Sequence, residues 1–147
     1  MNAAVYGFSK RDETTTDQSV VYLGLGKNGP GAGILLDGHV ARGQFGFRGE
    51  VSFLPLYYNA SFYDRIKNKP YGPHLLRKEE IDALERLVAT IAATLLNPHS
   101  FIFSLVLDDL SHISRACEGY LPSCHIPRLL IGEWEEDYFF RTGSTRH

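Results

Sequence analysis

Apolar residues recur at three- and four-residue spacing in the middle of the chain, which is the pattern of an amphipathic helix. The series consists of Ile81, Leu84, Leu87, Val88, Ile91 and Leu95, with charged residues at positions between them. We therefore predict a helix over residues 77–96. Asn97-Pro98 is expected to end it, because proline disfavours helical backbone at the residue before it.

Two shorter helices are predicted on either side of this long one. The first covers residues 2–8 and ends near Gly7, and the second covers residues 109–118 and ends at Gly119. The stretch 52–74 is rich in Tyr, Phe, Asn and Pro and is too apolar for disorder. We expect it to be a packed excursion with short helical pieces.

Short, mostly apolar runs predict the strands of a sheet. They cover residues 19–25, 32–36, 101–107 and 126–131. Asp37-Gly38 is a strong signal for a type I′ hairpin turn leading into residues 39–41. Strands that alternate with helices indicate an α/β or α+β fold, and the length of the chain fits one domain over residues 1–147.

Composition excludes several classes of protein. The net charge is −2, so the chain has no excess of basic residues with which to bind nucleic acid by itself. The sequence contains no apolar run long enough to span a membrane and no pattern typical of a secretion signal. Cys117 and Cys124 are too few and too close for a disulfide framework, so we expect free thiols in a soluble cytoplasmic protein.

Nine of the fourteen glycines fall between residues 24 and 49, interleaved with β-formers. This composition differs from that of a flexible linker, which lacks such residues. The pattern predicts a strand, a tight loop, a second strand, a hairpin and then a loop that presents Glu50. Glycine in such loops permits positive φ and close approach of backbone N–H groups to a ligand.

This glycine-rich segment resembles the signature of the ROK family (repressors, open reading frames and kinases). The family pattern is Gly-x-Gly-x-Gly-x-Gly-Ile, a spacer, Asp/Asn-Gly, Arg-Gly, and x-x-Gly-x-x-Gly-Glu-Ile-Gly-His. The matching residues are Lys27-Asn28-Gly29-Pro30-Gly31-Ala32-Gly33-Ile34, Asp37-Gly38, Arg42-Gly43, Gly46 and Gly49-Glu50. Weaker agreement is found at Asn2-Ala3-Ala4, Leu96-Asn97-Pro98 and Thr142-Gly143-Ser144.

The resemblance implies an actin-like, ribonuclease-H-like domain with a central mixed sheet flanked by helices. It corresponds to the second of two lobes that close over a sugar and, in kinases, over a nucleotide. The phosphate loop of the first lobe, Asp-x-Gly-x-Thr, is absent, and the catalytic aspartate of the family would fall just before Met1. We therefore expect a C-terminal lobe that is a fragment of a longer chain and has no catalytic residue of its own.

The resemblance also implies roles for five residues. Glu50 would accept hydrogen bonds from sugar hydroxyls, the alternative being a surface loop glutamate. Asn2 would lie near the sugar, or is simply a helix-terminal asparagine. Gly29, Gly31 and Gly33 would form the second phosphate loop of a kinase, or a tight turn between two strands.

Several positions depart from the kinase pattern. Asn28 stands where the family kinases have Thr, and Pro30 removes one backbone N–H. Leu107-Asp108-Asp109 replaces the Gly-Gly pair that lies against adenosine. Phe53 replaces a zinc-binding histidine, and the cysteine cluster of the family is missing. We therefore expect no nucleotide cofactor and no metal.

These observations predict the sugar-sensing and dimerisation domain of a ROK transcriptional regulator, a repressor. The alternative is the C-terminal lobe of an ATP-dependent, glucokinase-like sugar kinase, and a third possibility is a decayed protein kept only as a folded dimer. The partners expected are a sugar or sugar phosphate and a second copy of the chain, with DNA bound only through a domain outside this chain and no membrane. The tyrosine-rich run 56–71 is the expected dimer interface, although aromatic rings can also stack on sugars.

Overall fold

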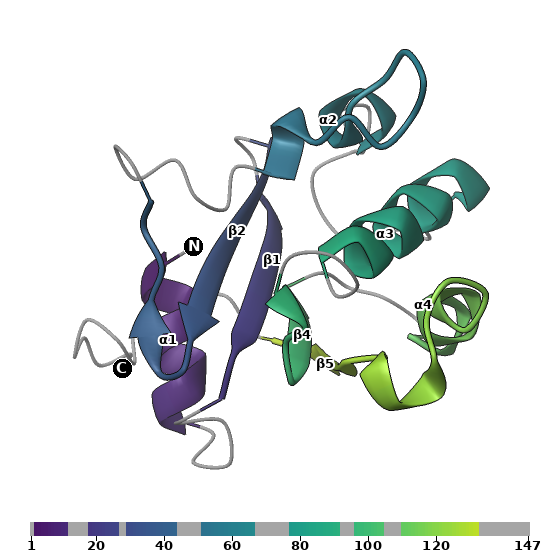
Figure 1. Cartoon of the computed structure of the whole chain (residues 1–147). Coiled ribbons are helices and arrows are strands. Elements are labelled where there is room, and N and C mark those ends of the chain that lie inside the picture. Colours follow the sequence, from purple (N-terminus) through teal and green to yellow (C-terminus); the bar gives the residue numbers. More distant parts are fainter. Residues whose placement is uncertain are drawn as a thin grey trace.

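A mixed five-stranded sheet with the strand order β3-β2-β1-β4-β5 forms the centre of the computed structural model (Figure 1). The strands are β1 (Val20–Gly26), β2 (Gly29–Leu36), β3 (His39–Val40), β4 (Ser100–Ser104) and β5 (Arg128–Ile131). β1 pairs antiparallel with β2, and β2 with β3, whereas β1, β4 and β5 run parallel to one another. The structure describes residues 2–11, 18–26, 29–43, 51–66, 77–91, 96–104 and 110–132.

Helices cover both faces of this sheet. α1 (Asn2–Arg11) lies on one face, where its apolar residues pack against β1, β2 and β4. α2 (Phe62–Ile66), α3 (Lys78–Thr90) and α4 (Ser111–Cys117) contribute to the core on the other face. The α/β class with a central mixed sheet flanked by helices is therefore confirmed.

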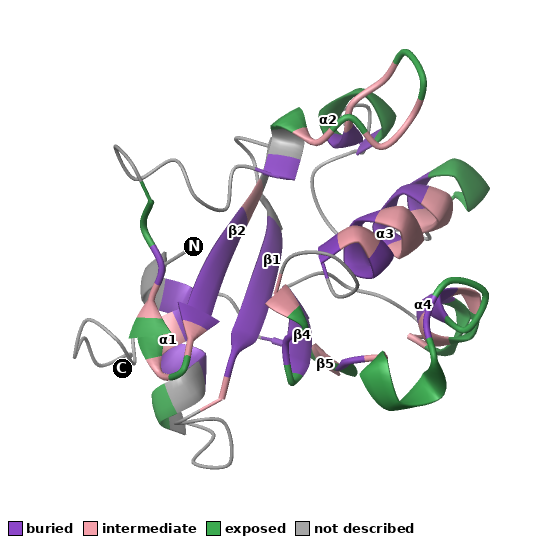
Figure 2. Ribbon diagram, in the orientation of Figure 1, coloured by how far each residue is buried: buried purple, intermediate pink, exposed green. Residues whose placement is uncertain are grey.

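The burial of β1 explains its nearly continuous apolar sequence. Val20 and Tyr22 belong to the α1 side of the core, while Val21 and Leu23 belong to the α3 side. All four side chains are fully buried, because both faces of the strand are covered (Figure 2).

Backbone geometry confirms a predicted hairpin turn and a predicted helix end. Asp37 and Gly38 both have positive φ, at 49° and 85°, and they join β2 to β3 as a type I′ turn requires. Asn97 has a φ of 42°, which ends the helical backbone ahead of Pro98. The predicted helix 77–96 is observed as α3, which ends at Thr90, with π-helical backbone at Ile91 and Leu96; residues 92–95 lie outside the described residues.

Several elements differ at their ends from the predictions; β5, for example, begins at Arg128 and not at Ile126. α1 does not end near Gly7 but continues to Arg11, because Phe8 is buried and packs edge-on against Tyr22 with ring centroids 6.2 Å apart. β2 begins at Gly29 rather than at Ala32, since its pairing with β1 extends to Gly26.

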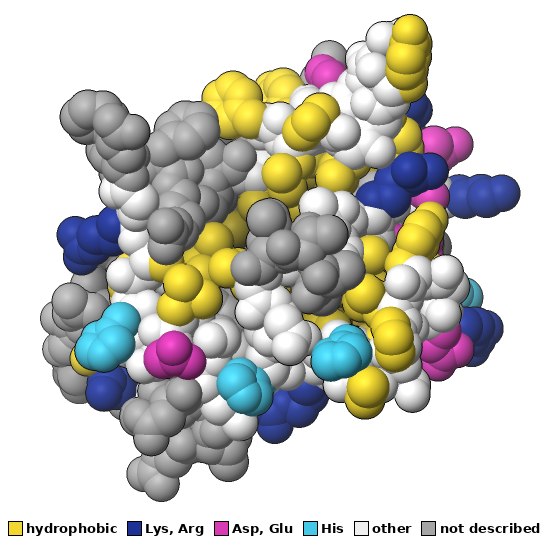
Figure 3. All heavy atoms as spheres, viewed as in Figure 1, with side chains coloured by type: hydrophobic (Ala, Val, Ile, Leu, Met, Phe, Trp, Pro, Cys, Tyr) yellow, Lys and Arg dark blue, Asp and Glu magenta, His cyan; other side chains and the backbone are white. Residues whose placement is uncertain are grey.

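Residues 51–66 include the described part of the packed excursion expected over 52–74, and residues 67–74 lie outside the described residues. The described part contains a 3₁₀ turn at Val51–Phe53 and the helix α2, and the buried Phe62 and Ile66 hold it against the core. Three aromatic residues of the segment remain exposed, namely Phe53 (66%), Tyr58 (98%) and Tyr63 (45%). Hydrophobic side chains gather around α2 at the top of the face shown in Figure 3. Within the described residues, no helix is both long and apolar enough to cross a membrane.

Candidate functional site

Five glycines line one face of the β1–β2 hairpin, and we call them the glycine ladder: Gly24, Gly26, Gly29, Gly31 and Gly33. Gly24 pairs with Gly31, and Gly26 pairs with Gly29. Gly33 pairs with Tyr22. Because side chains alternate between the faces of a strand, all five share the face of Tyr22, which is the face covered by α1.

The strand geometry of the glycine ladder explains the Gly-x-Gly spacing of the sequence. A spacing of two is the period of a strand, so the glycines leave one face of the hairpin end without side chains. A ligand can approach bare backbone of this kind closely where it is open, as at the partly exposed Gly31, whereas Gly24 and Gly33 are buried. Gly29, Gly31 and Gly33 lie within β2, and residues 27 and 28, which connect the two strands, are outside the described residues.

α1 runs antiparallel to β1, so its N-terminal end is directed toward the glycine ladder (Figure 1). Its first residue is Asn2, while Ala4, Val5 and Phe8 pack further along the sheet. The fold thus brings the Asn2 end of the helix toward the predicted phosphate-loop glycines. Glu50, the predicted sugar-binding residue, lies outside the described residues, and its role stays a prediction.

The glycine ladder lies at the carboxyl edge of the three parallel strands. In open α/β sheets, ligands bind outside this edge. Packing is close at the end of β5, next to Tyr22. There the N–H of Gly132 donates to the carbonyl of Phe103 over 2.8 Å. A Cβ on Gly132 would lie 2.6 Å from Cγ2 of Ile102 and 2.8 Å from the hydroxyl of Tyr22. Residues 105–109, which include Leu107-Asp108-Asp109, are outside the described part of the chain.

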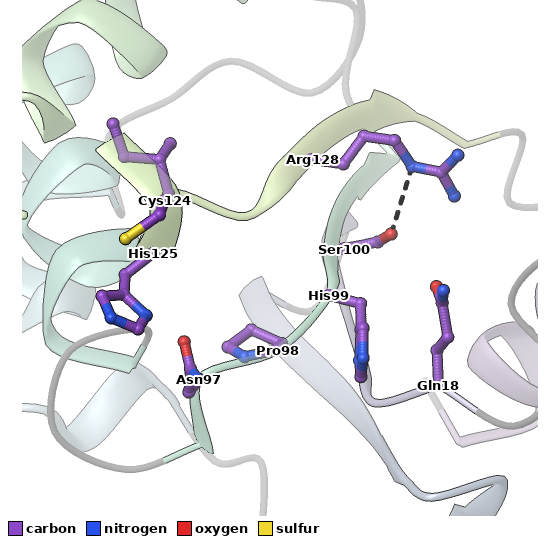
Figure 4. Close-up of a pocket in the computed structure, with 9 residues that line it drawn as sticks. Gln18, Asn97, Pro98, His99, Ser100, Cys124, His125 and Arg128 are labelled. Atoms are coloured by element: carbon purple, nitrogen blue, oxygen red, sulfur yellow. Dashed lines mark hydrogen bonds between the residues drawn. The ribbon is translucent and has the colours of Figure 1, made fainter. Parts of the chain in front are cut away.

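The opposite, amino edge of the sheet contains a polar hollow of about 570 Å³, which the sequence did not reveal (Figure 4). Its walls come from three distant segments, which precede or begin β1, β4 and β5. The lining residues are Gln18, Asn97, Pro98, His99, Ser100, Cys124, His125, Ile126 and Arg128. No periodicity or motif connects these segments, so sequence patterns gave no signal for the hollow.

Hydrogen bonds fix His99 at the centre of this edge. The N–H of Ser19 donates to Nδ1 of His99 over 3.1 Å, and the N–H of His99 donates to the carbonyl of Ser19 over 2.9 Å. The N–H of Arg128 donates to the carbonyl of His99, and Nε of Arg128 donates to Oγ of Ser100 over 3.3 Å. Because Nδ1 of His99 accepts a hydrogen bond, the neutral imidazole carries its proton on Nε2.

A separate charged cluster connects the 51–66 excursion to α3. The hydroxyl of Tyr57 donates a hydrogen bond to Oδ2 of Asp82, and Nε of Arg86 donates one to the same oxygen over 2.9 Å. The guanidinium groups of Arg65 and Arg86 lie 4.3 and 4.6 Å from the centre of the Tyr57 ring. Burial and the bond to Asp82 raise the pKa of Tyr57 to about 12, so the phenol stays protonated at neutral pH. These contacts hold the 51–66 excursion against α3.

The cysteines are free thiols, as predicted. Cys117 is buried in α4, and burial together with the charge of Glu85 raises the pKa of its thiol to about 11. Cys124 is exposed beside the polar hollow. Among the described residues, no three His, Cys, Asp or Glu side chains are placed to hold a metal ion.

Comparison with known proteins rests on structure alone. The sequence matches no family model, and it matches no curated protein. Among solved structures it is similar to a ROK-family glucokinase from Streptomyces griseus in complex with glucose and AMPPNP. The TM-score is 0.58 at 16% identity, over 97% of this chain and 65% of the glucokinase.

Two further structures give the same result. A ROK hexokinase from Thermus thermophilus matches with a TM-score of 0.61 at 18% identity, over 95% of this chain and 61% of that one. A ROK-family protein from Streptococcus pneumoniae in complex with sucrose matches with a TM-score of 0.59 at 14% identity, over 95% and 62%. This chain therefore spans less than two thirds of each of these proteins. The likeness confirms the predicted resemblance at the level of the actin-like fold.

Proposed function

We propose that this chain, which has the fold of ROK-family sugar kinases, is the sugar-binding lobe of a ROK-family protein. The observation that carries the proposal is the glycine ladder at the carboxyl edge of the sheet, with the Asn2 end of α1 directed toward it. The sequence frame Gly49-Glu50 follows the same hairpin along the chain. In this proposal Glu50 accepts hydrogen bonds from the sugar hydroxyls, because a carboxylate offers several acceptor positions.

We further propose that the lobe senses sugar as part of a cytoplasmic transcriptional regulator and does not transfer phosphate. Pro30 contributes no N–H to the hairpin, and Leu107-Asp108-Asp109 stands where family kinases carry Gly-Gly. Two carboxylates and a bulky leucine disfavour a nucleotide at that position. Sugar binding would bias the closure of two lobes and so alter an attached DNA-binding domain.

The second candidate is the C-terminal lobe of a sugar kinase, which fits the similar structures at least as well. Two of the similar proteins described above are a glucokinase and a hexokinase, and the first of these was solved with AMPPNP. The two candidates differ in their need for a nucleotide. Binding of AMPPNP to this chain therefore discriminates between them.

We also propose that two copies of the chain pair through the aromatic residues of the 51–66 excursion. Tyr58 and Tyr63 are exposed within the run 56–71 that is predicted as an interface, and the exposed Phe53 precedes this run along the chain. Exposed aromatic rings are enriched at protein interfaces. Sedimentation velocity on the wild type and on Tyr58→Ser tests this part, because the substitution removes an exposed ring that makes no contribution to the buried core.

Ligand-observed NMR on the whole 147-residue chain tests the ligand assignment. Glucose and sucrose are titrated against the wild type, Glu50→Gln and the control Glu118→Gln, whose side chain is exposed after α4. We expect saturable glucose or sucrose binding that Glu50→Gln weakens about tenfold and Glu118→Gln leaves unchanged. Binding of Mg-AMPPNP would replace the regulator with the kinase candidate, and absence of binding to either sugar would contradict the sugar-binding proposal.

A further inference from the structure

We propose that sugar binding at the glycine ladder strengthens the pairing of two copies through the 51–66 excursion. This coupling rests on the proposed function, which it extends to regulation. The β1–β2 hairpin separates the two surfaces, because the glycine ladder lies on the face covered by α1 and the excursion packs against the opposite face. Figure 1 shows α2 of the excursion beside the end of the hairpin that carries the ladder.

The hairpin is one layer of backbone thick, so its two faces move together. Leu23 and Ala32 pair with one another, and they alternate along the hairpin with the ladder pair Gly24 and Gly31. The side chains of Leu23 and Ala32 therefore point away from the ladder, toward the core on the α3 side. Val51 is buried in this same core, and its 3₁₀ turn contacts β2. A ligand that fixes the ladder backbone consequently fixes the surface on which Val51 packs.

A short hydrogen-bonded path connects Val51 to the exposed aromatic residues. Val51 begins the 3₁₀ turn that ends at the exposed Phe53. The N–H of Leu54 donates to the carbonyl of Val51 over 3.1 Å, and the N–H of Phe62 donates to the carbonyl of Leu54 over 2.8 Å. Phe62 is fully buried and is followed in α2 by the exposed Tyr63. The position of Val51 therefore sets the positions of two aromatic residues of the proposed interface.

The sequence provides a second connection, because Glu50 immediately precedes Val51. A carboxylate held by sugar hydroxyls restrains the backbone of the next residue as well. Restraint of the excursion before pairing lowers the entropic cost of ordering it at an interface. Sugar binding should therefore favour pairing. Since coupling between two binding events is reciprocal, pairing should strengthen sugar binding by the same factor.

Sedimentation velocity over a series of concentrations of the whole chain tests the coupling. The dissociation constant of the pair is measured with and without a saturating amount of glucose or sucrose, whichever binds in the ligand-observed titration. Glycerol at matched viscosity is the reference. We expect the sugar to lower the dissociation constant at least about fivefold. In Tyr58→Ser, the variant designed to prevent pairing, the sugar should still slow hydrogen exchange at the amides of Leu54 and Phe62.

Matched core variants test the path through the hairpin. We expect Val51→Ala to reduce the coupling to less than about twofold, because it removes the methyl groups that pack against the hairpin. Val88→Ala removes the same atoms from α3 in the same core, outside the hairpin and the excursion, and should keep the coupling. Equal loss of coupling in both variants would contradict this path.

The comparison on the wild type does not depend on how the variants fold. Sugar binding and pairing that both occur, with dissociation constants that differ less than about twofold with and without sugar, would overturn the coupling and leave the proposed function intact. Absence of sugar binding, or of pairing, would overturn the coupling together with that part of the proposed function.

Discussion

The hydroxyl of Tyr57 donates a hydrogen bond to Oδ2 of Asp82, which connects the 51–66 excursion to helix α3. Arg86 donates to the same carboxylate oxygen from the next turn of α3. The excursion carries the exposed aromatic residues of the proposed interface. The bond between Tyr57 and Asp82 therefore determines how firmly this surface is held.

Removing the phenolic hydroxyl should loosen this connection. We predict that Tyr57→Phe lowers the free energy of unfolding by about 1 kcal/mol, because one hydrogen bond to a charged acceptor is lost while the ring stays. Urea denaturation of both proteins gives the value. Tyr58→Phe is the matched control, since Tyr58 is 98% exposed, and it should have no effect.

The same bond should make stability depend on acid pH. The hydrogen bond from Tyr57 and the neighbouring Arg86 hold the pKa of Asp82 below its ordinary value. The ionised carboxylate therefore contributes stability above about pH 4, and this contribution is lost as the pH falls through the lower pKa of the folded state. We predict that the stability difference between wild type and Tyr57→Phe shrinks between pH 7 and pH 3. A difference that stays constant over this range would contradict the assignment.

A methyl group on Gly132 should be costly. Its Cβ would lie 2.6 Å from Ile102 and 2.8 Å from Tyr22, and both of these side chains are fully buried. We predict that Gly132→Ala destabilises the fold by about 1–3 kcal/mol through overpacking. Gly119→Ala is the control, because its Cβ would meet only the carbonyl oxygen of Ala116 at 3.3 Å. Thermal unfolding of the two variants should therefore differ clearly.

The two thiols should differ in reactivity. Cys117 is buried with a pKa raised to about 11, whereas Cys124 is exposed. Since the thiolate is the reactive form, we predict that iodoacetamide at pH 8 modifies Cys124 and leaves Cys117 intact in the folded protein. Mass spectrometry after digestion locates the label, and denaturant should make both thiols react. Equal labelling under native conditions would contradict the burial of Cys117.

The sequence predicted most elements because their signals are local. The helix over α3 follows from apolar spacing, and the turn at Asp37-Gly38 follows from residues that accept positive φ. The ends of elements were less predictable. Glycine has a low strand propensity, so the sequence placed the start of β2 at Ala32, whereas pairing with β1 extends it to Gly29. Packing of Phe8 against Tyr22 likewise carried α1 past Gly7.

The candidate sites differ in the same way, because one has a local sequence signal and the other depends on long-range contacts. The glycine ladder was visible in the sequence as a motif, although its strand geometry was not. The polar hollow was invisible, because it joins segments that are distant in sequence, as the bond between Ser19 and His99 across 80 positions illustrates. Such sites depend on chain topology and not on local pattern.

Mapping of glucose onto the backbone amides of this chain by NMR tests the central claim most directly. The account predicts saturable shifts concentrated on the glycine ladder and on the first turn of α1, at the carboxyl edge of the sheet. Loss of these shifts in Glu50→Gln, with the fold preserved, would identify the residue that holds the sugar. Shifts confined to other surfaces, or no shifts at all with glucose or sucrose, would contradict the claim that this edge binds sugar.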